Sequence, residues 1–340
     1  MVKRQSKSLF DVAAKAGVSH QTVSRVLNNH KNVSAKTRES VEKALKELNY
    51  RPNSAARALV TGVTSTIGVL CFDTTFYGPA SMLHGVQVAA LENSYDVKFY
   101  GFQESIFENL IDGIKNLTSN GIDGLIIMVP ELDEKILKSK FLAGIPLVLV
   151  GGNESVNVSS VAIDQYLGAR LATKHLIQLG HKNISHLHGP LNWSDAKQRN
   201  DGWQAEMEKN NLSVTSVAAG DWTAKSGYLA GLKLLTHQKI TAVFAANDAM
   251  ALGLYQAAEE LGLNVPADIS IVGFDNSPES EYFRPALTTV NQDFSATGQQ
   301  GLELLIQRIN GNSRAREHRL IAPELLVRGS TAPRSAKKRG

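Results

Sequence analysis

The sequence predicts an all-α head followed by an α/β body whose parallel sheets form two lobes. Residues 1–50 contain three short amphipathic helix patterns, and the first two are separated by a glycine turn. From Ser65 onward, short apolar runs alternate with amphipathic stretches of roughly ten to sixteen residues, as in parallel strands joined by helices. This alternation continues for roughly 265 residues, and two similar lobes suit that length better than one domain.

The head carries the punctuation of three capped helices. Ser8 is a good N-cap for the first helix, and Asp11 follows three residues later. Gly17 can take the left-handed conformation that ends this helix. Ser19 is expected to cap a second helix and Ser34 a third. Two helices around a glycine turn, braced by a third, make a helix-turn-helix arrangement.

The second helix of the head has two distinct faces. Wound at about 100° per residue, it places Val23, Val26 and Leu27 on one arc. The opposite arc is polar and consists of His20, Gln21, Ser24, Arg25 and Asn28. Amide and guanidinium groups suit base edges and hydroxyls suit phosphates, so this face fits a DNA major groove. Most amphipathic helices with such a polar face simply expose it to solvent. The charge distribution along the chain helps to decide between solvent exposure and DNA binding.

Charge is divided sharply along the chain. Residues 1–62 carry twelve Lys and Arg against four Asp and Glu, a net charge of +8. Residues 63–333 carry twenty against twenty-eight, a net charge of −8, and residues 334–340 add four basic side chains. A basic head on an acidic body favours a polyanionic partner for the head. We expect the basic tail, residues 334–340, to be a solvated end rather than a second DNA site.

Several other classes of protein are disfavoured. No stretch approaches the roughly 20 apolar residues of a membrane span, and "MVKRQSKSLF" lacks the apolar region of a secretory signal, so a cytoplasmic protein is expected. The single cysteine, Cys71, lies in an apolar run and is expected to be a core thiol. Nucleotide-loop, nucleophile-elbow and zinc-protease motifs are absent, so neither an enzyme nor a cofactor is expected. His181, His186 and His188 lack partners at ligand spacing, which favours buried or edge-strand histidines over a metal site.

Ligand-binding residues are expected where the strands of the body end. The expected strands are residues 66–72, 96–102, 124–130, 146–151, 160–163, 184–190, 242–247 and 269–275. In open α/β sheets, ligands bind beyond the carboxyl ends of the strands. The polar and aromatic residues in those loops that suit a sugar are Arg199, Trp222, Asn247, Asp275 and Gln292. Each alone is as well explained as a cap or turn residue. Asp248 is expected to cap its helix, and Asp275 with Asn276 could simply form a turn.

Between head and body, residues 51–64 are expected to form a hinge helix and linker. Asn53 can cap a short helix that runs to Leu59, and Gly62 begins a flexible connection. Such a helix is shorter than the roughly 12 residues needed for stability alone, so it should fold against a partner such as DNA. Leu59 could then act as an apolar wedge in the minor groove.

Taken together, these motifs resemble the LacI/GalR family of transcription regulators along essentially the full chain. The segments that carry the resemblance are "LFDVAAKAGVSHQTVSRVLN", "VSAKTRESVEKALKELNYRPNSAARAL", "AVFAANDAMALG", "ISIVGFDN" and "LTTVNQD". The resemblance implies two periplasmic-binding-protein-like lobes. Lobe 1 would span about 65–163 and 293–322, and lobe 2 about 164–292 and 323–333. The chain would cross between them near Asp164, Asp293 and Pro323.

The resemblance also implies roles for individual residues. His20, Gln21 and Arg25 would read operator bases, and Leu59 would be the hinge wedge. The other DNA-contacting residues would be Ser8, Ser19, Thr22, Ser24, Asn28, Asn53 and Ala56. The effector sugar would be held by Arg199, Trp222, Asn247, Asp275 and Gln292, with Phe76 and Pro79 beside them.

The function implied is that of a repressor of sugar-utilisation genes, bound to operator DNA as a homodimer and released by a neutral sugar. The C-terminal "STAPRSAKKRG" lacks leucine heptads, so a dimer is expected rather than a tetramer. A galactoside is the first choice of effector. Galactoside-binding members of the family present polar residues where this chain has Met128 and Gly151, which makes the lobe 1 side of the site more apolar. The alternatives are a corepressor, a phosphoprotein partner, or a glucoside or other disaccharide.

Overall fold

The computed structural model describes residues 7–27, 30–50, 62–103, 107–119, 121–152, 157–214, 217–237, 239–312 and 315–334. The chain divides into two compact units, Met1–Thr64, which contains the head, and Ser65–Gly340, the body. Four of the expected DNA-contacting residues lie outside the described residues: Asn28, Asn53, Ala56 and Leu59. Residues 335–340 of the basic tail lie outside them as well.

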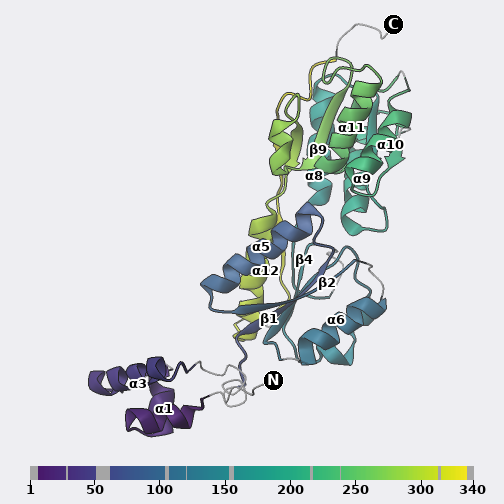
Figure 1. Ribbon diagram of the computed structural model, residues 1–340. Coiled ribbons are helices and arrows are strands. Elements are labelled where there is room, and N and C mark those ends of the chain that lie inside the picture. The colour runs from purple at the N-terminus through teal and green to yellow at the C-terminus, as the bar shows by residue number, and fades with distance from the viewer. Residues whose placement is uncertain are drawn as a thin grey trace, which may run out of the picture. The chain divides into compact units, whose positions relative to one another are not determined.

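The described part of the head contains three helices around a small apolar core. They are α1 (Leu9–Ala16), α2 (His20–Leu27) and α3 (Ala35–Glu47) (Figure 1). Ser8 and Asp11 form a reciprocal capping box at α1, and Gly17 ends that helix with φ 68°. The hydroxyl of Ser19 accepts the Thr22 amide at 3.2 Å, and Ser34 caps α3. The three predicted caps are therefore confirmed.

The buried side of α2 joins the core of the head. Val23 and Val26 are buried against Val12 of α1 and Val41 of α3. Because these apolar contacts all come from one arc of α2, its opposite arc is left at the surface. The fold thereby presents the polar face that the sequence predicted.

In the body, the first half of the chain builds most of a parallel six-stranded sheet, which defines lobe 1. Its strand order is β11-β5-β4-β3-β1-β2. The strands are β1 (Thr66–Phe72), β2 (Asp96–Phe102), β3 (Gly124–Met128), β4 (Leu147–Val150), β5 (Ser160–Ile163) and β11 (His318–Ile321). The helices of this lobe are α5 (Tyr77–Glu92), α6 (Phe107–Ser119), α7 (Glu134–Leu137) and α12 (Phe294–Ile309), with a 3-10 turn η1 (Lys140–Leu142).

A second six-stranded sheet defines lobe 2, and its order is β12-β10-β9-β8-β6-β7. The strands are β6 (Ile184–His188), β7 (Val217–Ala219), β8 (Ala242–Ala245), β9 (Ser270–Asp275), β10 (Thr288–Asn291) and β12 (Glu324–Leu326). The helices are α8 (Gln165–Gln178), α9 (Ser194–Lys209), α10 (Ala224–Leu234) and α11 (Asp248–Glu260), with a 3-10 turn η2 (Pro278–Tyr282). The edge strand β12 pairs antiparallel with β10, and the other pairs of this sheet are parallel as predicted.

The chain passes from one lobe to the other in three places. It leaves lobe 1 between β5 and α8 at Asp164, returns between β10 and α12 at Asp293, and passes back between β11 and β12 at residues 322–323. Asp164 caps α8 and Asp293 caps α12, each through its side chain. Two of the three crossovers therefore lead directly into a capped helix.

Helix pairs inside each lobe touch through their backbones. A Cβ atom added to Gly85 of α5 would lie 2.1 Å from the carbonyl oxygen of Ser295, and one added to Gly298 of α12 would lie 2.1 Å from that of Met82. These two glycines permit α5 and α12 to pack in contact, side by side (Figure 1). In lobe 2, Gly227 of α10 and Gly253 of α11 make the same kind of reciprocal contact.

The buried titratable side chains agree with the expectations for inert groups. Cys71 is fully buried, and burial raises the pKa of its thiol to about 12. His186 stacks on Phe244 with ring centroids 4.6 Å apart, and burial lowers its pKa to about 3. In the described ranges, no group of three or more His, Cys, Asp or Glu residues is placed to hold a metal ion. Among the described helices, none has the length and apolar character needed to span a membrane.

Candidate functional site

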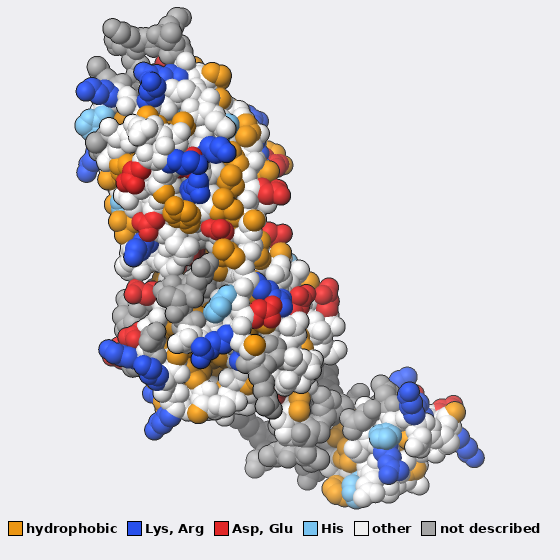
Figure 2. Space-filling model, turned by 180° about the vertical axis from the view of Figure 1, so that it is seen from behind, with side chains coloured by type: hydrophobic (Ala, Val, Ile, Leu, Met, Phe, Trp, Pro, Cys, Tyr) orange, Lys and Arg blue, Asp and Glu red, His pale blue; other side chains and the backbone are white. Residues whose placement is uncertain are grey.

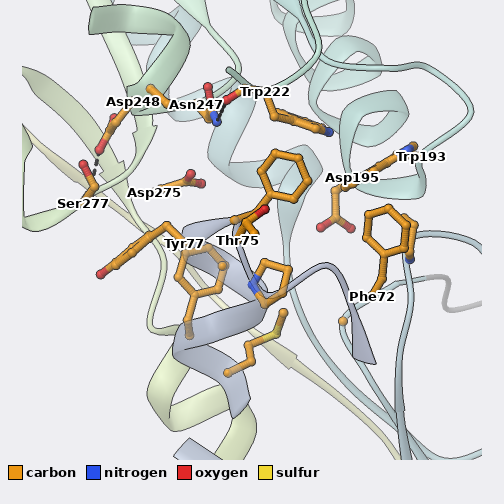
Figure 3. A pocket seen from close by; sticks show the side chains of 18 of the residues that line it. Phe72, Thr75, Tyr77, Trp193, Asp195, Trp222, Asn247, Asp248, Asp275 and Ser277 are labelled. Atoms are coloured by element: carbon orange, nitrogen blue, oxygen red, sulfur yellow. Dashed lines mark hydrogen bonds between the residues drawn. The ribbon is translucent and has the colours of Figure 1, made fainter. Parts of the chain in front are cut away.

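A cavity of about 510 Å³ lies where the carboxyl ends of the two sheets of the body meet. Lobe 1 contributes the start of α5 and the ends of β3 and β4, and lobe 2 contributes the ends of β8 and β9 and the start of α9. Figure 3 shows polar side chains of lobe 2 facing aromatic side chains across it. Pockets for small ligands typically occupy roughly 300 to 1,000 Å³, so this cavity is of suitable size.

Arg199 lies at the centre of the polar side. It projects from α9, is 4% exposed, and its Nη1 lies 3.7 Å from Oδ1 of Asp275. The same Nη1 donates to the carbonyl of Ala246. Its guanidinium lies 4.1 Å from the centroid of Phe274 and 5.3 Å from that of Trp222. The side chain is thus fixed on several sides, and its charge faces the cavity in an aromatic setting.

Two buried glutamines connect Arg199 to Asp275 by a second route. Arg199 donates from Nε to Oε1 of Gln165 at 2.8 Å. Gln165 donates to Oε1 of Gln292 at 2.8 Å, and Gln292 donates to Oδ1 of Asp275 at 2.6 Å. We call Gln165 and Gln292 the glutamine bridge. It lies at two crossovers, because Gln165 is the first residue of α8 and Gln292 precedes Asp293.

Trp222 and Asp275 adopt backbone conformations that residues other than glycine rarely take. Trp222 has φ 75° and Asp275 has φ 110°. Such conformations are costly and persist where surrounding contacts enforce them, commonly at ligand sites. The geometry indicates that these two conformations lower the stability of the fold and that they direct both side chains toward the cavity.

Asn247, and not Asp248, is the N-cap of α11. Asn247 is the N-cap of α11, where its Oδ1 accepts the Met250 amide at 2.8 Å, and its Nδ2 donates to the Trp222 carbonyl at 3.0 Å. Asp248 is the first helical residue and accepts the Thr289 hydroxyl at 2.6 Å. The expectation that Asp248 caps this helix is therefore wrong, because the extended backbone of Asn247 puts the amide side chain at the cap.

Three carboxyl groups at the cavity have raised pKa values because they are removed from water. Burial raises the pKa of Asp275 to about 7 against the opposing effect of Arg199, and raises that of Asp248 to about 8. Burial also raises the pKa of Asp195, again opposed by Arg199. Asp195 has no hydrogen-bond partner among the described residues. Its oxygens are therefore available to a ligand.

Much of the remaining wall of the cavity is apolar. It is formed by aromatic and methionine side chains, which include Phe72, Phe76, Met82, Met128, Trp193 and Phe294. Pro79 and Gly151 also line it. Of these, Phe76, Pro79, Met128 and Gly151 were singled out from the sequence.

The expected effector residues do not all occupy the same position relative to the cavity. Arg199, Trp222, Asn247 and Asp275 line it with Phe76 and Pro79. Gln292 is not among the lining residues; it is 4% exposed and both ends of its amide are engaged by Gln165 and Asp275. Its geometry is that of a support for Asp275 rather than of a ligand contact.

On the head, the polar face of α2 is open to solvent. His20, Gln21 and Arg25 are exposed, and Ser8 and Ser19 are exposed beside them. Thr22 and Ser24 are partly buried. Lys, Arg and His side chains are visible on the surface of the head in Figure 2. The exposed polar side chains of α2 are the groups that the sequence analysis assigned to base edges and phosphates.

Sequence reasoning missed further residues at these two sites besides Phe72, Met82 and Phe294. Phe10 on α1 is 67% exposed, and its ring lies 5.1 Å from that of His20. Trp193 and Asp195 line the cavity from the start of α9. The segment after β6 was expected to reach the ligand, but only Arg199, which lies on α9, was singled out from it. The one signal for Phe10 in the sequence was a large apolar residue two positions after the Ser8 cap.

Comparisons with known proteins agree with this architecture. A model of bacterial regulatory proteins of the lacI family matches residues 8–53, and one of a periplasmic binding protein-like domain matches residues 173–331. The chain is 35% identical to the lactose operon repressor of Escherichia coli (strain K12) over 326 residues, covering 95% of this chain and 90% of that protein.

Two further matches extend over similar lengths. The chain is 36% identical over 333 residues to the HTH-type transcriptional repressor PurR of Haemophilus influenzae (strain ATCC 51907 / DSM 11121 / KW20 / Rd), with 95% of this chain and 98% of that one covered. A crystal structure of the lac repressor dimer bound to operator and the anti-inducer ONPF superposes with a TM-score of 0.91 at 35% identity, over 96% of this chain and 100% of that one. The predicted fold class and family resemblance are thus confirmed.

Proposed function

This chain belongs to the lacI family of DNA-binding transcriptional repressors, and on that premise we propose that it represses sugar-utilisation genes and is released from its operator by a neutral sugar. In this proposal a homodimer presents two heads to the operator, as in the lac repressor dimer bound to operator. The sugar binds in the cavity between the lobes of the body.

The observation that carries the sugar assignment is the arrangement of Arg199, Asp275 and Trp222 at one end of the cavity. A pyranose offers hydroxyls to a carboxylate and a guanidinium, and a C–H face to an aromatic ring. The Oδ2 oxygen of Asp275 and the Nη2 group of Arg199 have no hydrogen bond within the described residues, so both remain available. Hydrogen bonds to such charged groups are the stronger kind.

The charge of the cavity argues for a neutral ligand over a phosphorylated one. Arg199 is the one basic side chain among the residues that line it, whereas Asp195, Asp248, Asp275 and Glu279 are acidic. A phosphate group would find one guanidinium that is already shared with Asp275, so its charge would be poorly compensated. A neutral polyhydroxylated ligand meets no such penalty.

A galactoside is our first choice of sugar and a glucoside the second. The first choice is supported by the 35% identity to the lactose operon repressor. The apolar wall with Met128 and Gly151 leaves space beyond one ring, which favours a disaccharide or a substituted glycoside over a monosaccharide. We infer that the ligand acts as an inducer.

The proposed mechanism couples the cavity to the head through relative movement of the lobes. Ligand contacts on Asp275 and Arg199 of lobe 2 and on Phe76 of lobe 1 favour a closed arrangement of the lobes. Closure would shift the lobe 1 surfaces of a dimer against each other and weaken the operator-bound state. The coupling free energy expected for such a switch is about 1–3 kcal/mol per effector.

The test compares wild type with Asp275→Ala in the full-length protein. An operator is first selected from random DNA duplexes, and its release is then followed during titration with lactose and other neutral glycosides. Asp275→Ala should bind the operator normally and fail to respond to sugar, because it loses charge-assisted hydrogen bonds to the ligand. Asp201→Ala, an exposed acid on α9, serves as the matched control. A wild-type response in Asp275→Ala, or tighter binding of a sugar phosphate than of any neutral sugar, would contradict the proposal.

A further inference from the structure

The cavity continues past Trp222 to the first turn of α9. There the ring of Trp193 lies 5.7 Å from that of Trp222, and edge-on contacts join it to Phe72 at 5.0 Å and Phe76 at 6.0 Å. Asp195 lies two residues further along (Figure 3). We call the part of the cavity beside Trp193 and Asp195 the distal subsite.

Asp195 is the unusual group in the distal subsite. It precedes Arg199 by one helical turn, yet no ion pair or hydrogen bond engages its carboxylate among the described residues. Figure 3 shows it on the side of the cavity away from Asp275. A carboxylate in a largely enclosed apolar setting needs hydrogen-bond donors, and these must come from solvent or from a ligand.

Resting on the function proposed above, we propose that the distal subsite binds the second ring of a disaccharide, whose hydroxyls donate to Asp195. Trp193 supplies the flat apolar surface that a sugar ring packs against. The first ring then occupies the end of the cavity beside Arg199 and Asp275. Asp195 thereby becomes the residue that distinguishes a disaccharide from other glycosides.

An aryl or alkyl group at the distal subsite would be disfavoured by the same carboxylate. Such a group would displace water from Asp195 without replacing its hydrogen bonds, which leaves a desolvated acceptor unpaired. Sites built to hydrogen-bond a hydroxyl discriminate strongly against analogues that lack it.

The experiment measures binding of two matched pairs of probes to the full-length protein by calorimetry. The pairs are lactose with o-nitrophenyl galactoside, and cellobiose with o-nitrophenyl glucoside. In the pair with the preferred first ring, wild type should bind the disaccharide roughly tenfold or more tightly than the nitrophenyl compound. Asp195→Ala should weaken the disaccharide roughly 10- to 100-fold and change the nitrophenyl compound by less than about twofold.

Controls separate the subsite from the fold and from the proposed function. Asp201→Ala on the same helix should leave all affinities unchanged, and melting temperature with operator binding checks that Asp195→Ala is folded. Equal effects of Asp195→Ala on both probes, or a wild-type preference for the nitrophenyl compound, would overturn the distal subsite while Asp275→Ala still abolished sugar binding. If wild type binds none of the four probes, both the subsite and the sugar function are overturned.

Discussion

Replacing Gln165 with alanine removes the centre of the glutamine bridge. Its side chain makes two hydrogen bonds, one accepted from Arg199 and one donated to Gln292, both at 2.8 Å. Both partners are 4% exposed. The substitution therefore leaves a guanidinium N–H and an amide oxygen without their present partners in the interior.

The expected loss follows from these two vacated groups. A buried polar group without a partner costs about 1–3 kcal/mol, and a charged one costs more. Water that enters the space left by the side chain recovers part of this cost. We therefore expect Gln165→Ala to lower the free energy of unfolding by about 2–4 kcal/mol. For a domain of this size that corresponds to a fall in melting temperature of roughly 5–12 °C.

Thermal unfolding of the full-length protein, followed by tryptophan fluorescence, measures the effect. Gln178→Ala is the matched control because Gln178 is an exposed residue on the last turn of the same helix. The control should stay within about 0.5 kcal/mol of wild type. A melting temperature for Gln165→Ala equal to that of Gln178→Ala would refute the reasoning, since the bridge would then contribute nothing.

Two further predictions concern the head and the pH dependence of the body. Gln21→Ala should cost roughly 1–3 kcal/mol of operator affinity and relax the base preference at one position, which competition with single-base operator variants measures. Equal loss on random DNA would place Gln21 on the backbone instead. Because burial raises the pKa of Asp275 to about 7, the folded body binds more protons than the unfolded chain between about pH 4 and 7. Its stability should therefore fall as pH rises through that window, and Asp275→Asn should reduce the slope in denaturant titrations; an unchanged slope would contradict this assignment.

The sequence predicted the parts of the site that follow from a general rule of parallel sheets. Arg199, Trp222, Asn247 and Asp275 line the cavity because loops at the carboxyl ends of neighbouring strands converge. The same rule misplaced Gln292, because it says where a side chain begins and not which way it turns. The amide of Gln292 turns toward Gln165, a residue 127 positions away in the sequence.

Other features depended on information that the sequence pattern lacks. Trp193 and Asp195 become part of a site only when Phe72 and Phe76 of the other lobe face them across the cavity. Asn247 and Asp248 are both good cap residues, and only the backbone conformation decides between them. The short strand β7 (Val217–Ala219) was absent from the expected strands because an apolar run of three residues is too short to indicate a strand.

The glycine contact between α5 and α12 limits which residues can be changed when this protein is engineered to sense a different ligand. Gly85 and Gly298 bring the two backbones together, and the cavity-facing ends of these helices carry Tyr77 and Phe294, whose rings meet edge-on at 5.7 Å. The two helices therefore pack as one unit that runs from the cavity into lobe 1. Mutagenesis aimed at a new analyte can vary the wall, at Met82 and Met128 for instance, while the two glycines stay fixed. A methyl group at either glycine would push α5 and α12 apart. Ligand binding in the cavity would then no longer be coupled to the rest of lobe 1.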